Sequence, residues 1–137
     1  GEVQWNTWFK PRGSGWCVRM DESGVYYGHA QGVMKYDYDA KTVWSNDTVV
    51  SVLFGVQTAE HLFVTGCGRD DFNAGSCQID KATGETVRVF QASGSSCAVN
   101  QLGTLFVVQR QAFDVSSGEQ VWKFEPDYTR DPTRLNN

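Results

Sequence analysis

Residues 113–122 read FDVSSGEQVW, and this stretch returns twice along the chain. Residues 79–88 read IDKATGETVR, and residues 36–44 read YDYDAKTVW, which is one residue shorter. A partial copy, GEVQW, occupies residues 1–5. The aspartates of the three full copies lie 43 and 34 residues apart. Self-similarity at this spacing predicts that the chain repeats one supersecondary unit.

Each copy has the same internal order. A short apolar stretch is followed by a turn and then by a β-branched and aromatic run, as in residues 25–27, 62–64 and 105–108. Such runs favour strands. A further short strand leads into the repeated Asp, and a turn and a last strand complete the copy. No segment has a sustained 3.6-residue period, so we expect four strands per copy and almost no helix.

The repeated motif has a structural explanation. A turn aspartate can accept hydrogen bonds from backbone N–H groups a few residues ahead, and a glycine can adopt the positive φ that closes the hairpin. The tryptophan of the last strand can then pack on a sheet face. We assign these structural roles to Asp37, Asp80, Asp114, Gly84, Gly118, Trp5, Trp44 and Trp122.

The repeats divide the chain into one domain and a tail. We expect a single repeat domain over residues 1–125, with an N-terminal strand at residues 2–9 and a flexible tail at residues 126–137. The repeats are expected at residues 10–47, 48–92 and 93–125. The predicted fold is all-β, with about three propeller-like blades of four antiparallel strands plus one extra N-terminal strand.

The motifs resemble the pyrroloquinoline-quinone-like (PQQ-like) β-propeller repeat family. The third copy matches best, from residues 103–107 through Asp114 and Gly118 to Trp122, whereas the middle copy has Arg88 where the family has Trp. The resemblance implies a bladed fold, and other members of this family act as scaffolds for protein assembly. The quinone-dependent dehydrogenases of the family use adjacent cysteines in their cofactor site. This chain has no Cys-Cys pair, so we expect no cofactor.

The number of copies raises the question of closure. Propellers usually close with four to eight blades, and three blades would leave sheet edges exposed. Residues 1–2 match the sequence of residues 118–119, so the chain begins partway through a repeat. The chain could be a fragment of a longer propeller, or its N-terminal strand could complete the last blade. We favour a third alternative, in which copies associate and two of them supply about six blades.

Composition excludes some partners. The net charge is −4 and there are only 12 Lys and Arg residues, which gives no reason to expect nucleic-acid binding. No apolar run approaches the roughly 20 residues of a membrane-spanning helix, so we expect no membrane insertion. The two histidines lie near no cysteine pair and none of the four cysteines forms a CxxC motif, which argues against a zinc site.

The middle copy contains an expanded loop at residues 66–77. Its Asp70, Asp71 and Asn73 are candidate ligand residues, because their oxygens suit a hard cation, although the spacing matches no calcium loop. Cys67 and Cys77 flank the loop and could form a disulfide in an oxidising compartment, so an exported or periplasmic location is slightly favoured. Cys17 and Cys97 are expected to be inward-facing thiols.

Catalytic motifs are lacking, since neither His29 nor His61 has an identifiable partner in the sequence. We therefore expect a non-catalytic binding or assembly module that forms a homo-oligomer. A carbohydrate-binding propeller and a fragment of a larger PQQ-like repeat protein or enzyme are the alternatives. The candidate aromatic residues for sugar stacking are Trp8, Trp16, Tyr26, Tyr38 and Tyr128.

Overall fold

The computed structural model describes residues 1–4, 15, 17–68 and 75–125, and all regular secondary structure in these residues is β-strand. The first sheet contains β1 (Cys17–Asp21), β2 (Gly24–His29), β3 (Gly32–Tyr36) and β4 (Thr42–Asn46). The second contains β5 (Val49–Gln57), β6 (His61–Gly68), β7 (Ser76–Asp80) and β8 (Thr86–Phe90). The third contains β9 (Cys97–Val99), β10 (Leu105–Val108), β11 (Gln111–Asp114) and β12 (Gln120–Lys123).

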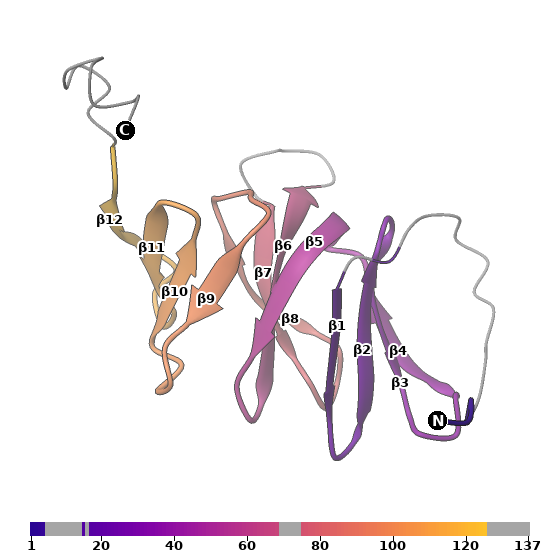
Figure 1. Ribbon diagram of the computed structural model, residues 1–137. Coiled ribbons are helices and arrows are strands. Elements are labelled where there is room, and N and C mark those ends of the chain that lie inside the picture. Colours follow the sequence, from indigo (N-terminus) through magenta and orange to yellow (C-terminus); the bar gives the residue numbers. More distant parts are fainter. Residues whose placement is uncertain (5–14, 16, 69–74, 126–137) are drawn as a thin grey trace.

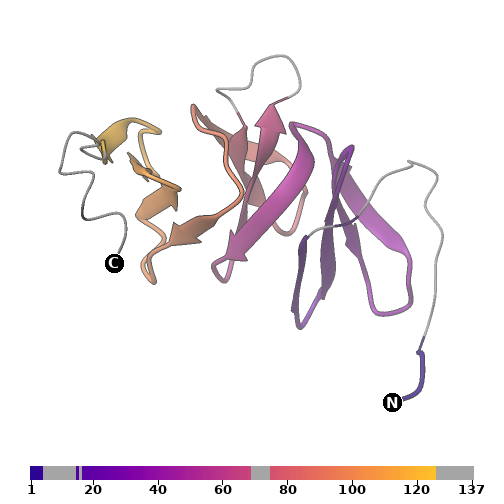
Figure 2. The ribbon, with the colours of Figure 1, turned by 45° about the horizontal axis from the view of Figure 1, so that its top comes forward.

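Each sheet is an antiparallel meander in which strands pair in chain order. The three sheets stand side by side in an open row, with the first and third at opposite ends (Figures 1 and 2). This arrangement confirms the predicted all-β fold of repeated, propeller-like, four-stranded sheets. No helix among the described residues is long and apolar enough to cross a membrane.

The N-terminal strand predicted at residues 2–9 lies largely outside the described residues. Its described part, residues 2–4, is not in a strand. The predicted tail at residues 126–137 lies outside the described residues as well. Within residues 1–4, 15, 17–68 and 75–125, the regular structure therefore runs from β1 to β12.

The same irregularity occurs in all three sheets, where the third strand pairs with the fourth. The register shifts at residues 35–36 in the first sheet, at 78–79 in the second and at 112–113 in the third. A bulge bends a strand and redirects its side chains. The shift occurs at the equivalent point of each sheet. The residue of the fourth strand that pairs next to it is therefore equivalent in all three sheets, and these residues are Trp44, Arg88 and Trp122.

Two apolar clusters fill the spaces between neighbouring sheets. The one between the first and second sheets comprises Tyr26, Val33, Trp44, Val49, Val52, Leu62, Val64, Cys77 and Ile79. The one between the second and third comprises Phe63, Phe90, Ala92, Phe106, Val108, Phe113 and Val115. Successive side chains on a strand point to opposite faces. The second sheet can thus contribute to both clusters, and the core consists of two sheet-to-sheet interfaces.

Candidate functional site

The repeated aspartates organise the turns between the third and fourth strands. Asp80 Oδ1 accepts the backbone N–H groups of Ala82 and Thr83, both at 2.9 Å, and Asp114 Oδ1 accepts that of Ser117 at 2.8 Å. The hydrogen bonds from Thr83, chiefly that of its backbone N–H, lower the pKa of Asp80. These carboxylates are occupied in holding the turn, which is the role that the sequence predicts for them.

The turns close on residues with positive φ. Gly84 and Gly118 have φ of 77° and 76°, and each donates its N–H to the carbonyl of the turn aspartate at 2.8 Å. The first turn is one residue shorter and has no glycine. Ala40 takes the corresponding position with φ of 63° and donates its N–H to the Asp37 carbonyl at 3.1 Å. The sequence YDYDAKTVW has no glycine in this turn, but nothing in it predicts an alanine in this conformation.

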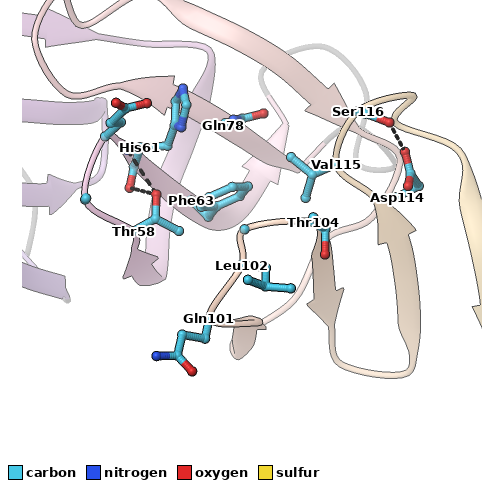
Figure 3. Close-up of a pocket in the computed structure, with 13 residues that line it drawn as sticks. Thr58, His61, Phe63, Gln78, Gln101, Leu102, Thr104, Asp114, Val115 and Ser116 are labelled. Carbon is cyan, nitrogen blue, oxygen red and sulfur yellow. Dashed lines mark hydrogen bonds between the residues drawn. The ribbon is translucent and has the colours of Figure 1, made fainter.

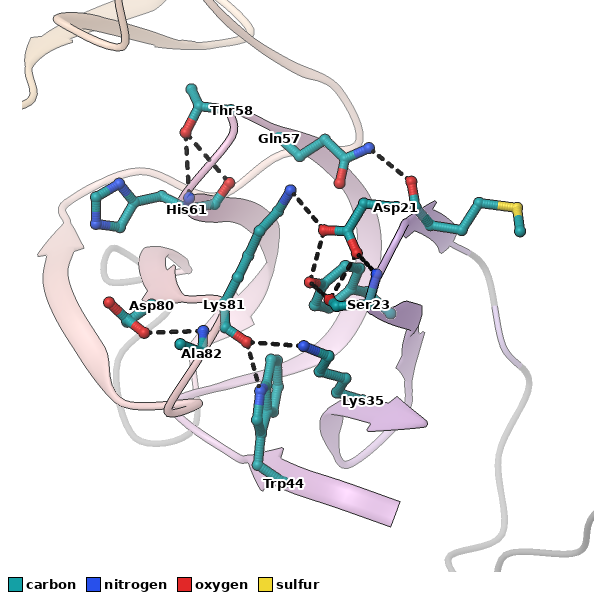
Figure 4. Close-up of polar contacts among 12 residues, drawn as sticks. Asp21, Ser23, Lys35, Trp44, Gln57, Thr58, His61, Asp80, Lys81 and Ala82 are labelled. Carbon is teal, nitrogen blue, oxygen red and sulfur yellow. Dashed lines mark hydrogen bonds and ion pairs between the residues drawn. The ribbon is translucent and has the colours of Figure 1, made fainter. Parts of the chain in front are cut away.

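Trp44 of β4 packs on the turn of the second sheet (Figure 4). Its indole Nε1 donates to the carbonyl of Lys81 at 2.9 Å, and the side chain is only 8% exposed. A Cβ atom placed on Gly84 would lie 2.5 Å from the Trp44 ring. The absence of a side chain at Gly84 therefore lets the indole lie directly against the turn backbone.

Arg88 makes the corresponding contact between the second and third sheets. Its guanidinium donates to the carbonyls of Ser116 and Ser117 at 2.5 and 2.8 Å. Its Cδ would lie 2.8 Å from a Cβ placed on Gly118. An N–H donor on the last strand thus meets carbonyl groups in the next turn in both interfaces. Arg88, which stands where the other two copies have tryptophan, thus makes the kind of contact that Trp44 makes.

Trp122 has the same position on β12 but is 46% exposed. It is the last of the three, and among the described residues no further sheet follows β12 in the row (Figure 1). At the other end of the row, Tyr38 in the first turn is also 46% exposed. Its counterparts after the other turn aspartates, Lys81 and Val115, are 6% and 9% exposed. The third sheet therefore exposes the residue that elsewhere packs on the next turn, Trp122. The first sheet exposes a turn of the kind that elsewhere receives such a residue.

A buried ion pair reinforces the first interface (Figure 4). Lys81 Nζ lies 3.1 Å from Asp21 Oδ2, and the side chains are 7% and 17% exposed. Burial acts to raise the pKa of Asp21, but hydrogen bonds from Ser23, Tyr26 and Lys81 outweigh it and hold that pKa far below its usual value. Burial, together with the Asp21 charge, raises the pKa of Tyr26 to about 12. At neutral pH the Asp21 carboxyl is therefore charged and the Tyr26 hydroxyl is neutral.

Sequence reasoning missed two residues that join the first and second sheets. Lys35 donates its ammonium to the carbonyl of Lys81 at 3.2 Å. Asn46 donates its amide to the Gly84 carbonyl and to Thr86 Oγ1, both at 2.8 Å. The first repeat carries Lys35 opposite Trp44 in register, so both donors can reach the same turn. A search for donor side chains paired with the Trp position could have found Lys35.

Two hollows lie above the sheet-to-sheet interfaces. The one between the second and third sheets has a volume of about 530 Å³ and is lined by His61, Phe63, Gln78, Leu102 and Val115 among others (Figure 3). The ring of His61 meets that of Phe63 edge-on, with centroids 6.5 Å apart. The other hollow, of about 680 Å³, is lined by the residues around the ion pair. Among the described residues, no three His, Cys, Asp or Glu side chains are grouped to hold a metal ion.

The predicted disulfide between Cys67 and Cys77 is not present, since the structure has both residues as thiols. Cys77 lies opposite Val64 in the β6–β7 pairing, and Cys67 is three residues beyond Val64 on β6. Three residues of strand extend about 10 Å and place the two side chains on opposite faces. A disulfide needs Cα atoms less than about 7 Å apart, so the register prevents the bond. Cys97 is also a thiol.

Several predicted residues lie outside the described part of the chain. They are the loop candidates Asp70, Asp71 and Asn73, the packing residue Trp5, and the sugar-stacking candidates Trp8, Trp16 and Tyr128. Of the two described sugar-stacking candidates, Tyr26 is 1% exposed and lies within the first interface. The other described candidate, Tyr38, is 46% exposed.

The comparisons with known proteins bear on the fold. No family model matches the sequence, and no curated protein matches it. Solved structures do match, among them that of the computationally designed Ika4 protein. It aligns with a TM-score of 0.68 at 12% sequence identity, over 86% of this chain and 76% of that one. At this identity, the likeness concerns the fold alone.

Proposed function

We propose that this chain is a non-catalytic assembly module, of the PQQ-like repeat kind, that self-associates to complete a propeller. The observation that carries the proposal is the exposure of Trp122. Its counterpart Trp44 is 8% exposed because the second sheet covers it, whereas Trp122 is 46% exposed. The outer face of the third sheet thus has the residue of a sheet-to-sheet interface without the neighbouring sheet.

The chemistry of the described acids supports a structural role. Asp80 and Asp114 accept backbone and hydroxyl hydrogen bonds within their own turns. Asp21 is paired with Lys81. A general acid or base needs to exchange a proton near neutral pH, and the pKa values of these three carboxyls are all lowered. They are therefore suited to holding turns and interfaces.

Closure of the row supports self-association in particular. The outer face of a terminal repeat must be polar or be covered by a partner, and propellers commonly close with four to eight blades. Two copies of a three-sheet row supply six. Two contacts, each between the last sheet of one copy and the first sheet of the other, would cover all the exposed ends without any other protein.

The solution mass tests this proposal. Light scattering over a dilution series should give twice the chain mass of 15.3 kDa at high concentration and a shift toward the single chain on dilution. A mass of one chain at every concentration up to about millimolar would refute self-association, since a weaker contact corresponds to less than about 4 kcal/mol.

A further inference from the structure

The contact between neighbouring sheets has two halves, which can be defined by residue. The covering residue is Trp44, Arg88 or Trp122, on the last strand of each sheet. The receiving turn follows the third strand of each sheet and spans residues 37–41, 80–85 or 114–119. Three sheets contain three of each. Two covering residues and two receiving turns are used within the chain.

One covering residue and one receiving turn have no counterpart within the chain, and each is of the kind that the other needs. They are Trp122 on the third sheet and the turn at residues 37–41 on the first, where Tyr38 is exposed to the same 46%. The two sheets lie at opposite ends of the row in both views, so these halves do not meet within one chain (Figures 1 and 2). A second copy of the chain provides the missing half for each.

We propose that Trp122 of one copy packs on the turn at residues 37–41 of a second copy, and that the second copy returns the same contact. This inference rests on the proposed self-association and names the residues that form it. The contact joins different surfaces of the two copies, so it closes only if the rotation between neighbouring sheets brings six sheets into a ring. Such a ring has two identical seams.

The internal contacts indicate the chemistry of the seam. Trp44 Nε1 donates to the carbonyl of Lys81, which is the residue after the turn aspartate. In the turn at residues 37–41 that residue is Tyr38, so its carbonyl is the corresponding acceptor for Trp122. An exposed aromatic ring that gains both a hydrogen bond and apolar cover is the type of residue that dominates interface energies.

Ala40 makes the seam looser than the internal contacts. It has the position that Gly84 has in the second turn, where a Cβ would lie 2.5 Å from the covering indole. The methyl group of Ala40 therefore holds a Trp122 ring away from the backbone. An Ala40→Gly change should remove this obstacle and also relieve an alanine from its positive φ of 63°. It should thus tighten the association.

A double-mutant cycle on the dissociation constant tests the pairing, using sedimentation over a dilution series. Trp122→Ala should raise the constant at least about tenfold, which is the usual effect of truncating a central interface aromatic. Ala40→Gly should lower it several-fold. In the Trp122→Ala background, the effect of Ala40→Gly on association should disappear, because the ring that the methyl group obstructs is gone.

Val121→Ala is the matched control. Val121 is the neighbour of Trp122 on β12 and is 58% exposed. Its counterparts Val43 and Val87 are 48% and 49% exposed even though a further sheet follows theirs. The seam should therefore leave Val121 uncovered, and the control should change the dissociation constant less than about twofold.

The outcomes separate this inference from the proposed function. A dimer whose constant shows no coupling between residues 40 and 122 would refute the seam and leave self-association standing. A wild-type chain that remains single would refute both. Unfolding of each variant, followed at a concentration where the chain is single, distinguishes lost association from lost folding, since the two positions are far apart in one copy and should act additively there.

Discussion

Gly84→Ala tests whether the close approach of Trp44 to the second turn holds the first interface together. The new methyl group would lie 2.5 Å from two atoms of the indole, well inside van der Waals contact. The backbone cannot yield easily, because residue 84 has φ of 77° and its N–H donates to the Asp80 carbonyl. The ring must therefore move away from the turn.

Three contributions set the expected loss of stability. An alanine held at positive φ costs about 1 kcal/mol. Forcing a methyl group into a packed contact costs about 1–3 kcal/mol. A withdrawn indole also lengthens the hydrogen bond from Nε1 to the Lys81 carbonyl, which contributes about 1 kcal/mol. We expect the free energy of unfolding to fall by about 3 kcal/mol, a large part of what a domain of this size has.

Gly103→Ala provides the control for the backbone contribution. Gly103 also has a positive φ, of 68°, but a Cβ placed there would come no nearer than 3.4 Å to Thr58. Its substitution should cost only about 1 kcal/mol. Urea unfolding followed by far-UV circular dichroism measures both variants. If Gly84→Ala costs no more than Gly103→Ala, the packing of Trp44 on this turn does not matter to stability and the reasoning is wrong.

Two further predictions concern titration and reactivity. Burial acts to raise the pKa of Asp21, but hydrogen bonds from Ser23, from Tyr26 and, to a smaller extent, from Lys81 lower it in the folded chain. The ionised carboxylate therefore stabilises the fold above its unfolded pKa, near 4, and this stabilisation is lost as the pH falls through the lower folded pKa. Asp21→Asn should therefore lower stability at pH 7 and flatten the acid limb of a stability–pH curve below about pH 4. An unchanged acid limb would contradict the role of the ionised Asp21 carboxylate in the interface. Burial raises the pKa of the Cys77 thiol to about 12. A thiol reagent should therefore label the half-buried Cys97 in the native chain, and Cys77 only when the chain unfolds. Equal labelling rates for the two residues, measured by mass spectrometry, would contradict this.

The repeated motif allowed the fold to be predicted because its residues act locally. The turn aspartate accepts N–H groups within four residues, and Gly84, Gly118 or, in the first copy, Ala40 closes the same turn. Such interactions do not depend on the rest of the molecule, so they can be recognised in the sequence alone. Four strands per copy followed from the same spacing, and the three sheets observed have that composition.

The disulfide predicted between Cys67 and Cys77 was wrong because it depends on strand register, which nearby residues do not determine. The interval from Cys67 to Cys77 suggests a hairpin with the two thiols facing each other. The pairing instead sets Cys77 opposite Val64, and one odd shift in register turns a side chain to the other face. The register of β6 against β7 is set by which side chains fill the two interfaces, and Cys77 belongs to the first cluster. The spacing of cysteines carries no information on that choice.

The role of Arg88 was missed for a different reason. Arg88 shares its hydrogen-bonding chemistry with Trp44 but not its residue type. In an alignment of the three copies, Arg88 is the residue that differs from Trp44 and Trp122. Its guanidinium nevertheless donates to carbonyl groups in the next turn, as the indole of Trp44 does. What the repeat conserves physically is an N–H donor with an apolar stem that can lie against a backbone without Cβ. The sequence predicts that Trp122 also packs on a turn and donates to it, but it does not say which turn.

The burial of the two tryptophans shows why. Trp44 and Trp122 have the same place in their motifs and the same register against the bulged third strand, but their exposed fractions are 8% and 46%. Their own sheets therefore cannot account for the difference, and the neighbouring sheet must. A large aromatic left half in water forgoes apolar burial that amounts to about 1–2 kcal/mol. This energy favours any neighbour that presents a suitable turn, and the chain itself carries one at residues 37–41.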